Sequence, residues 1–480
     1  MKKTFPLTVF TLMVLGATGL HAQTKPAEHY QDLRYPSLNK IQPPKPERFT
    51  LANGMTVYLV QDHELPMITV SALIRVGSRW EPVAKAGLAD IVGTVMRTGG
   101  TATRNGDKLD EELDRLGAVV ETGVGEDSGG ATVSVLKEDI NLGLDILADL
   151  LEHPAFPQDK IELAKIAHRD SIARRNDFPS GIVGREFRRI LLGKDSPYAH
   201  QTEYATIDAV TREDLVAFHQ QYFQPENVIL GVWGDFGAEM KPRLEKVFGA
   251  WARGGHPRPP VPAVDPDCPK RAGLYQINKQ DVNQSWVVMG QLAGRRDNPD
   301  FYPLDLMNQI LGDGFASRLF SQVRSAQGLA YAVGSSWAAG WDRPGIFSAS
   351  GHTKSETTTK ILTAIKAELG KLIESGVSDE ELQRVKDATL KGFAFEFDST
   401  GKIVERLMRY EYYGYPSDYL DRYQENIGKV TREDVARVAK QYLKPEQFVV
   451  LVLGNTKDFD RPLASLGAVK DVDITIPKPQ

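Results

Sequence analysis

One predicted helix carries three positions that are three and four residues apart, a spacing at which helical side chains can bind a metal together. Two of these positions lack side chains that bind metals. Residues 85–97, KAGLADIVGTVMR, have apolar residues at i, i+3, i+4, i+7 and i+8, the buried stripe of an amphipathic helix. Asp90, Gly93 and Thr94 stand at i, i+3 and i+4, so they share the neighbouring face. Asp90 alone could contact a cation, whereas Gly93 and Thr94 supply neither a general base nor a second strong ligand. The sequence therefore predicts no metal site in this chain.

Other catalytic patterns are also missing from the sequence. The chain has 9 histidines, and no two of them are three or four residues apart, so no helix offers a histidine pair one turn apart. The single cysteine, Cys268, excludes a disulfide within the chain and lies in a Pro-rich stretch, where we predict a linker residue. Gly312-Asp313-Gly314 lacks the remaining residues of a nucleotide-binding loop, and we predict a joint between helices there.

A second stretch holds two side chains that can donate hydrogen bonds. In residues 311–333, LGDGFASRLFSQVRSAQGLAYAV, the spacing places Arg324 at a helix end and Tyr331 on a strand that follows a turn at Gly328. A guanidinium and a phenol both donate hydrogen bonds to a peptide carbonyl and to its developing oxyanion. The residues alone also allow a structural role, with Arg324 in a salt bridge and Tyr331 as an ordinary strand aromatic.

Length and composition set the class of protein. A chain of 480 residues with 41% hydrophobic and 25% charged residues is expected to form more than one globular domain. A net charge of −5 gives no argument for binding nucleic acid or an anionic membrane. Residues 1–22 combine a basic start, a short apolar core and a small residue before Gln23, which predicts a cleaved signal peptide and a periplasmic location. The apolar core is too short for a membrane anchor.

The order of predicted elements indicates a mixture of strands and helices. An extended arm is expected over residues 23–47, followed by a hairpin around Asn53-Gly54. Further strands are predicted at residues 68–76, 131–136 and 228–233, and helices at residues 107–116, 140–151, 158–176 and 211–222. The last of these helices has Thr211 as its N-cap and Asp214 three residues later.

The second half of the chain repeats the first. Residues 210–236, VTREDLVAFHQQYFQPENVILGVWGDF, match residues 430–456, VTREDVARVAKQYLKPEQFVVLVLGNT, at a distance of 220 positions. Residues 252–270 are rich in Pro and Gly and connect the halves. We therefore predict an α+β fold with two homologous domains, residues 48–251 and 271–480, each a mainly antiparallel sheet covered by helices.

Both singled-out stretches resemble signatures of the pitrilysin/insulinase family of zinc peptidases. The family's inverted motif would be G-L-A-H-x-x-E-H, in which the two histidines bind zinc and the glutamate is the general base. This chain keeps the initial G-L-A but has Asp90, Gly93 and Thr94 at the catalytic positions. A further zinc-binding glutamate is expected downstream, and the matching residues 163–176 contain only Asp170 as an acid. The signature R-x-x-x-G-L-A-Y is complete, with Arg324 and Tyr331 at its ends.

The resemblance covers nearly the whole mature chain and implies a specific role. It implies two related domains that enclose a cavity, with Tyr331 placed to bind the polarised carbonyl and Arg324 to hold the substrate backbone. Several enzymes of the family pair a zinc-bearing chain with one that lacks the zinc motif. The resemblance thus implies the non-catalytic subunit of a heterodimeric periplasmic zinc metallopeptidase, inactive alone and without its own metal or cofactor, whose HxxEH-bearing partner carries the zinc and cleaves peptides.

Two alternatives remain open at this stage. The chain could be a catalytically dead peptide-binding or scaffold protein of the same fold, and an adjacent gene for an HxxEH homologue would argue against that. It could also be an active zinc peptidase with substitute ligands, which would show as stoichiometric metal in the pure protein.

Overall fold

The computed structural model describes residues 44–479. The predicted signal peptide, 1–22, and nearly all of the predicted arm, 23–47, therefore lie outside the described residues, and β1 starts at the end of that arm. Among the helices of the described part, none is both long and apolar enough to cross a membrane.

Two six-stranded sheets share one strand order. The first runs β1-β2-β6-β3-β5-β4 and the second β12-β7-β11-β8-β10-β9. In each, the last long strand of the half, β6 or β11, lies between two earlier strands and pairs in parallel with β2 or β7. The short strand β12 also pairs in parallel with β7, and the other pairings are antiparallel. The strands are β1 Glu47–Thr50, β2 Thr56–Gln61, β3 Met67–Ile74, β4 Val119–Val124, β5 Gly129–Leu136, β6 Val228–Gly234, β7 Gly273–Asn278, β8 Gln284–Leu292, β9 Ala332–Ala338, β10 Ile346–Lys354, β11 Val449–Gly454 and β12 Val469–Asp471.

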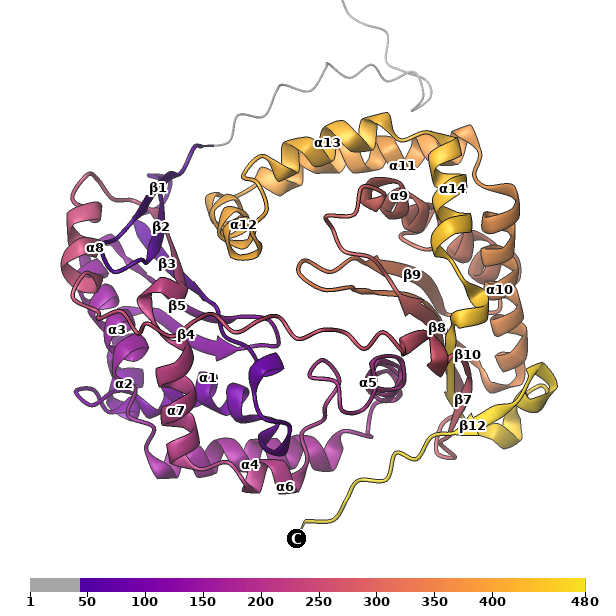
Figure 1. The fold of residues 1–480 in the computed structure, drawn as a ribbon, viewed down its shortest axis with the longest axis horizontal. Coiled ribbons are helices and arrows are strands. Elements are labelled where there is room, and N and C mark those ends of the chain that lie inside the picture. Colours follow the sequence, from indigo (N-terminus) through magenta and orange to yellow (C-terminus); the bar gives the residue numbers. More distant parts are fainter. Residues whose placement is uncertain (1–43, 480) are drawn as a thin grey trace, which may run out of the picture. The chain divides into compact units, whose positions relative to one another are not determined.

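Helices cover one face of each sheet and form a separate apolar core with it (Figure 1). The alternation of buried and less buried residues along β3 and β5 directs one side of these strands into the first core. The helices are α1 Leu88–Gly99, α2 Gly106–Leu116, α3 Ile140–Glu152, α4 Gln158–Arg174, α5 Pro179–Leu192, α6 Tyr204–Asp208, α7 Arg212–Tyr222, α8 Met240–Phe248, α9 Phe301–Leu311, α10 Thr358–Ser375, α11 Asp379–Gly392, α12 Thr400–Tyr413, α13 Tyr419–Lys429 and α14 Arg432–Tyr442.

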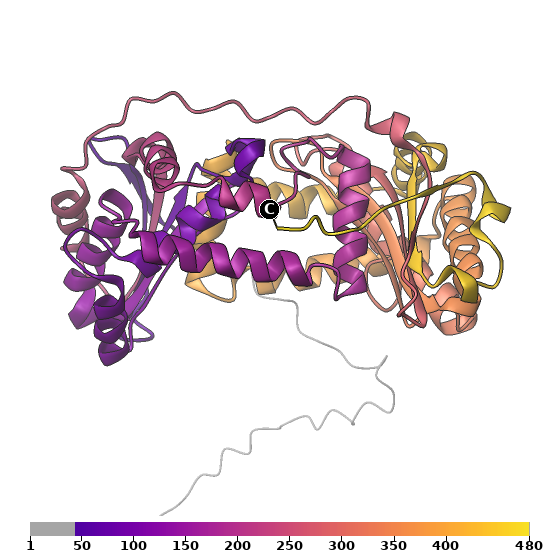
Figure 2. The ribbon, with the colours of Figure 1, turned by 90° about the horizontal axis from the view of Figure 1, so that it is seen from below.

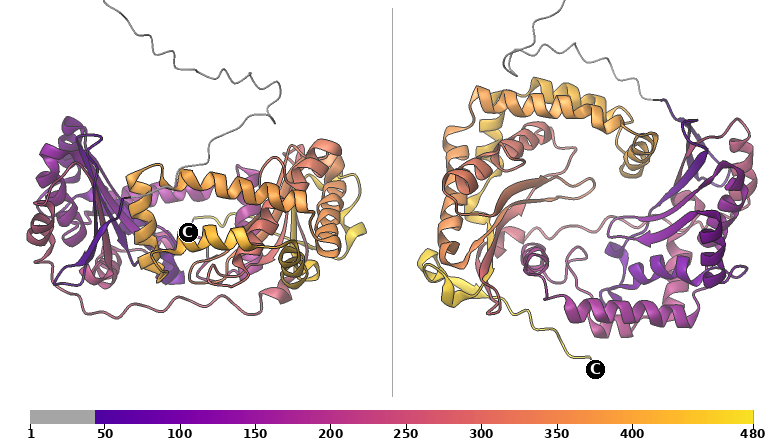
Figure 3. Two further views of the ribbon diagram at one scale, coloured as in Figure 1. Left: turned by 90° about the horizontal axis from the view of Figure 1, so that it is seen from above. Right: turned by 180° about the vertical axis from the view of Figure 1, so that it is seen from behind.

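The two halves exchange one helix each, and these helices cover the opposite faces of the sheets. Helix α5 of the first half packs on β8 and β11, where Ile182 and Phe187 join an apolar cluster with Leu451. Helix α12 of the second half packs on β2 and β6, where Val404 and Met408 contact the first sheet. Figure 2 shows α5 against the second sheet, and Figure 3 shows α12 beside the first. Each sheet is therefore covered on one face by its own half, and the exchanged helix of the other half covers part of the opposite face.

The predicted fold class is confirmed, and the repeat has a structural counterpart. Helices α7 and α14 both begin with a capping box, from Thr211 with Asp214 and from Thr431 with Asp434. Each helix leads through a 3₁₀ turn into the inserted strand, β6 or β11. Both sheets have the same strand order, and the helix–turn–strand units α7–β6 and α14–β11 occupy the same position in it. The chain therefore consists of two homologous α+β halves.

Two predicted elements have different bounds in the structure. Helix α1 starts at Leu88 and not at residue 85, because Gly87 has a φ of 105° and a 3₁₀ turn occupies the residues before it. The helix expected before Arg324 is a π-helical segment, Leu319–Ala326, and Tyr331 lies one residue before β9.

Candidate functional site

Helix α1 is held in place by a buried carboxylate at its N-terminus. The side chain of Glu81 accepts hydrogen bonds from the backbone N–H groups of Gly87, at 3.0 Å, and Ala89, at 2.8 Å. His200 contacts the same carboxylate at 3.0 Å, and both side chains are buried. A negative charge at this end satisfies free N–H groups and interacts favourably with the helix dipole. The degenerate zinc positions thus lie on a well-anchored helix.

Asp90 faces a histidine, His168, that the spacing of histidines along the sequence did not single out. The Oδ2 atom of Asp90 lies 2.9 Å from Nε2 of His168 on α4, and the Asp90 side chain is exposed. His168 belongs to residues 163–176, the stretch that matches the family's further zinc-binding glutamate. The signal for His168 in the sequence is that this stretch contains a histidine as well as an acid.

Gly93 and Thr94 add no ligand to this pair. Gly93 packs directly on β4: a Cβ atom there would overlap the backbone of Gly123 and Val124. The hydroxyl of Thr122 also donates to the Gly93 carbonyl at 2.6 Å. Within residues 44–479, no group of three His, Cys, Asp or Glu side chains gathers where it could hold a metal. An Asp–His pair without a third protein ligand does not fit the zinc site that the family implies.

Arg324 and Tyr331 lie together near the open edge of the second sheet, β9. The guanidinium carbon of Arg324 is 5.9 Å from the centre of the Tyr331 ring and 4.5 Å from that of Phe320. Gly328, with a φ of 63°, turns the chain between them, and its N–H donates to the Arg324 carbonyl at 3.1 Å. The Tyr331 ring stacks on His352 at 5.3 Å. Arg324 and Tyr331 therefore form one local unit.

The polar ends of both side chains are free of partners inside the described part of the chain. No ion pair or side-chain hydrogen bond there involves Arg324, so the salt bridge considered as its structural role is absent from this part, and Tyr331 is 75% exposed. No hydrogen bond or ion pair joins this unit to Asp90 or Thr94 among those residues. Tyr331 faces solvent, whereas Arg324 is half-buried.

Arg318 fixes the start of the segment that carries Arg324. Its guanidinium donates to both oxygens of Glu381 on α11, at 2.7 and 2.8 Å. This bidentate bond and the capping bonds with Ser378 lower the pKa of Glu381 to about 2. The charge pair ties the π-helical segment to a long helix, which limits where Arg324 can move.

Cys268 is not a candidate nucleophile. It lies in a 3₁₀ turn, Cys268–Arg271, and is buried in a cluster with Leu192 and Tyr198. Burial raises the pKa of its thiol, which disfavours the reactive thiolate. Its role is to anchor the end of the extended connection between the halves (Figure 2).

Two family models match this chain. Residues 56–186 match the insulinase family, peptidase family M16, and residues 209–389 match the peptidase M16 inactive domain. The first match contains α1 with its degenerate positions, and the second contains Arg324 and Tyr331.

Bacterial relatives match over most of their length. An uncharacterized zinc protease, YmxG, of Bacillus subtilis is 24% identical over 85% of this chain and 98% of its own length. An uncharacterized zinc protease of Rickettsia bellii is 26% identical over 70% of this chain and 80% of its own.

Solved structures share the fold. A peptidase M16 inactive domain from Pseudomonas fluorescens has a TM-score of 0.76 and 24% identity, covering 86% of this chain and 98% of that one. The periplasmic protease PqqL from Escherichia coli has a TM-score of 0.70 and 16% identity, covering 90% of this chain but only 49% of PqqL. The chain therefore belongs to the insulinase family of peptidases, family M16, as a member whose metal-binding positions lack their ligands.

Proposed function

We propose that this chain is the non-catalytic subunit of a heterodimeric zinc metallopeptidase in the periplasm. An HxxEH-bearing homologue would hold the zinc and the general base. Arg324 and Tyr331 of this chain would bind the substrate in the partner's active site. The observation that carries the proposal is that these two donors lie close together without a hydrogen-bond or ion-pair partner within residues 44–479, in a chain whose α1 offers only an Asp–His pair there.

The chemistry of the two side chains supports this role. A phenol hydroxyl can stabilise the oxyanion that forms when water attacks a peptide carbonyl, and a guanidinium can bind the neighbouring backbone carbonyls. The predicted signal peptide supports a periplasmic location, and a structural neighbour is titled a periplasmic protease. The alternative, a catalytically dead peptide-binding or scaffold protein, shares the fold but needs no partner.

The first step of the test is to purify the chain from its native host and identify what accompanies it. In the reconstituted pair, Tyr331→Phe removes only the hydroxyl and should lower turnover by about 10²–10³-fold, with the zinc content of the partner unchanged. Arg324→Ala should raise the Michaelis constant more than it lowers turnover. Tyr302→Phe on α9 is the matched control and should leave both constants unchanged.

Gel filtration of each variant pair shows whether the complex still forms. Unchanged peptidase activity with Tyr331→Phe would disprove the role of this hydroxyl. Failure to find any zinc-bearing partner would leave the scaffold or peptide-binding alternative.

A further inference from the structure

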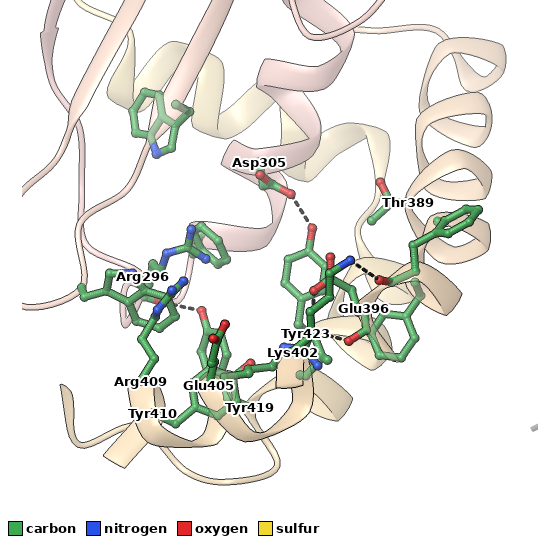
Figure 4. A pocket seen from close by; sticks show the side chains of 18 residues that line it. Arg296, Asp305, Thr389, Glu396, Lys402, Glu405, Arg409, Tyr410, Tyr419 and Tyr423 are labelled. Atoms are coloured by element: carbon green, nitrogen blue, oxygen red, sulfur yellow. Dashed lines mark hydrogen bonds and ion pairs between the residues drawn. The ribbon is translucent and has the colours of Figure 1, made fainter. Parts of the chain in front are cut away.

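A cavity of about 530 Å³ lies within the second half, away from Arg324 and Tyr331. Residues of α9, α12 and α13 line it, and Figure 4 shows Arg296, Asp305, Arg409 and Tyr410 around it. Much of its wall is aromatic, from Phe301, Trp337, Trp341, Tyr410, Tyr419 and Tyr423. Its volume is that of a small-molecule or peptide-end site.

The cavity is the counterpart, in the second half, of the degenerate zinc positions in the first. The burial patterns of α1 and α9 coincide when Asp90 is aligned with Asp305, which also aligns Thr94 with Gln309. Asp90 contacts His168 of α4, and Gln309 accepts a hydrogen bond of 2.9 Å from Thr389 of α11. The cavity that Asp305 lines therefore lies at the position in the second half that corresponds to Asp90 in the first.

Two arginines at this cavity have no charged partner. Arg296 stacks over Trp341, with its guanidinium carbon 4.4 Å from the ring centre, and its Nε is buried without a hydrogen-bond partner. Neither Arg296 nor Arg409 makes an ion pair with another residue of the described part, and the Arg296 guanidinium lies near the hydroxyl of Tyr419. A guanidinium held on an aromatic face with free N–H groups is suited to bind a planar anion.

The acids at the cavity do not cancel these charges. Burial raises the pKa of Asp305, and its carboxyl accepts hydrogen bonds from Tyr423 at 2.6 Å and Gln309 at 3.2 Å. Glu396 is already paired with Arg406 at 2.7 Å. Glu405 is then the one acid lining the cavity without a hydrogen-bond or ion-pair partner in the described residues. The cavity therefore has two unpaired positive charges, from Arg296 and Arg409, and one unpaired negative charge, from Glu405.

One further donor at the cavity is unsatisfied. Trp337 is only 6% exposed, and its indole Nε1–H has no acceptor within residues 44–479. A buried donor without an acceptor costs stability, and either an ordered water or an occupant of the cavity can supply one.

We propose that this cavity binds a carboxylate carried on an apolar or aromatic body, such as the C-terminal end of a peptide. The fork of Arg296 would hold the two carboxylate oxygens, and the aromatic wall would bury the body. All residues of this site come from this chain, and binding there requires no catalytic partner. The binding test can therefore refute the carboxylate site without refuting the proposed subunit role.

The test titrates the purified full chain and follows its tryptophan fluorescence, because Trp337 and Trp341 line the cavity. The probes are a synthetic pentapeptide ending in phenylalanine, the same peptide as a C-terminal amide, and N-acetylphenylalanine. The free acid of the peptide should bind at least tenfold more tightly than the amide. If N-acetylphenylalanine binds tightly and the peptide does not, the cavity binds a carboxylate, and its ligand is a small acid rather than the end of a peptide. Equal binding of acid and amide, or no binding of either acid, would overturn the proposal.

Two variants connect binding to this cavity. Arg296→Gln should lower the affinity for the acid at least tenfold, whereas Arg432→Gln, at an exposed arginine of α14, should not change it. Trp337→Phe keeps one aromatic ring but removes the indole N–H together with part of the buried ring system, so it should weaken binding several-fold and also lower the melting temperature. If Arg296→Gln and Trp337→Phe both bind the acid as the parent chain does, the carboxylate does not bind in this cavity.

Discussion

At the scale of single residues, Gly93 determines how α1 packs and what it can carry. The helix lies so close to β4 that a Cβ atom at this position would meet strand backbone, which cannot move aside like a side-chain end. A glutamate at position 93 would therefore require α1 or β4 to shift. Asp90, one turn before Gly93 on the same helix, instead pairs with His168 of α4 at 2.9 Å.

We expect Gly93→Ala to lower the free energy of unfolding by about 1–3 kcal/mol, the usual cost of overpacking a well-packed core. Gly184→Ala on α5 is the matched control, because a Cβ there meets nothing within 4 Å. The control should be neutral or stabilising by about 0.4–1 kcal/mol, since alanine reduces the entropy of the unfolded chain. Urea unfolding measures both, and equal effects at the two glycines would refute the packing argument.

At the scale of elements, a buried histidine joins α7 to α3. The Nε2–H of His219 donates to the carbonyl of Leu151 at 2.9 Å, which fixes its tautomer. Its ring stacks on Phe223 at 4.8 Å and meets the edge of Phe156. Burial lowers the pKa of His219 to about 4, because the protonated ring would lose its hydration there.

This pKa predicts that the protein loses stability on acidification. Between the ordinary histidine pKa of about 6.5 and the folded value of about 4, the unfolded chain binds the proton and the folded chain does not. The contribution of His219 is therefore complete above about pH 6.5 and declines as the pH falls to about 4, by roughly 3 kcal/mol in total.

The measurement is the free energy of unfolding of the parent chain and of His219→Gln at pH 7.0, 5.5 and 4.5. Glutamine can still donate to the Leu151 carbonyl but does not titrate, so the variant should lose less stability than the parent over this range. Parallel pH profiles of the two proteins would show that His219 is not the titrating group.

At the scale of the whole described chain, the exchanged helices couple the two halves. Helix α12 buries Met408 against the first sheet, and α5 buries Phe187 against the second. Ion pairs also cross between the halves: Arg79 contacts Asp342 at 2.9 Å, and Arg48 contacts Glu411 at 2.8 Å. Each half therefore leaves an apolar part of its sheet uncovered without the other.

We therefore expect one cooperative unfolding transition for both halves. Met408→Ala removes a buried side chain between the halves, and Met307→Ala removes one inside the second core. Each should lower the free energy of unfolding of the same transition by about 2–5 kcal/mol. Far-ultraviolet circular dichroism and tryptophan fluorescence should give coincident curves, and two separate transitions would contradict the coupling.

Local patterns in the sequence were sufficient for much of the fold. Apolar periodicity predicted α1, α2, α3 and α4, and the Asn53-Gly54 turn predicted the first hairpin. The repeat at a distance of 220 positions predicted two homologous halves, because similar local sequences build similar units. The sequence alone also shows that no two histidines are spaced one helical turn apart, which is the spacing that a zinc-binding histidine pair on a helix needs.

Contacts between distant segments were decided only by the tertiary structure. Periodicity shows which face of a helix is apolar but not what covers it, so the exchange of α5 and α12 had no sequence signal. The pairing of Asp90 with His168, and the lack of room at Gly93, depend on how closely α1 approaches α4 and β4. The cavity around Arg296 and Trp337 likewise combines residues from several elements, because a pocket is a property of packing rather than of spacing along the chain.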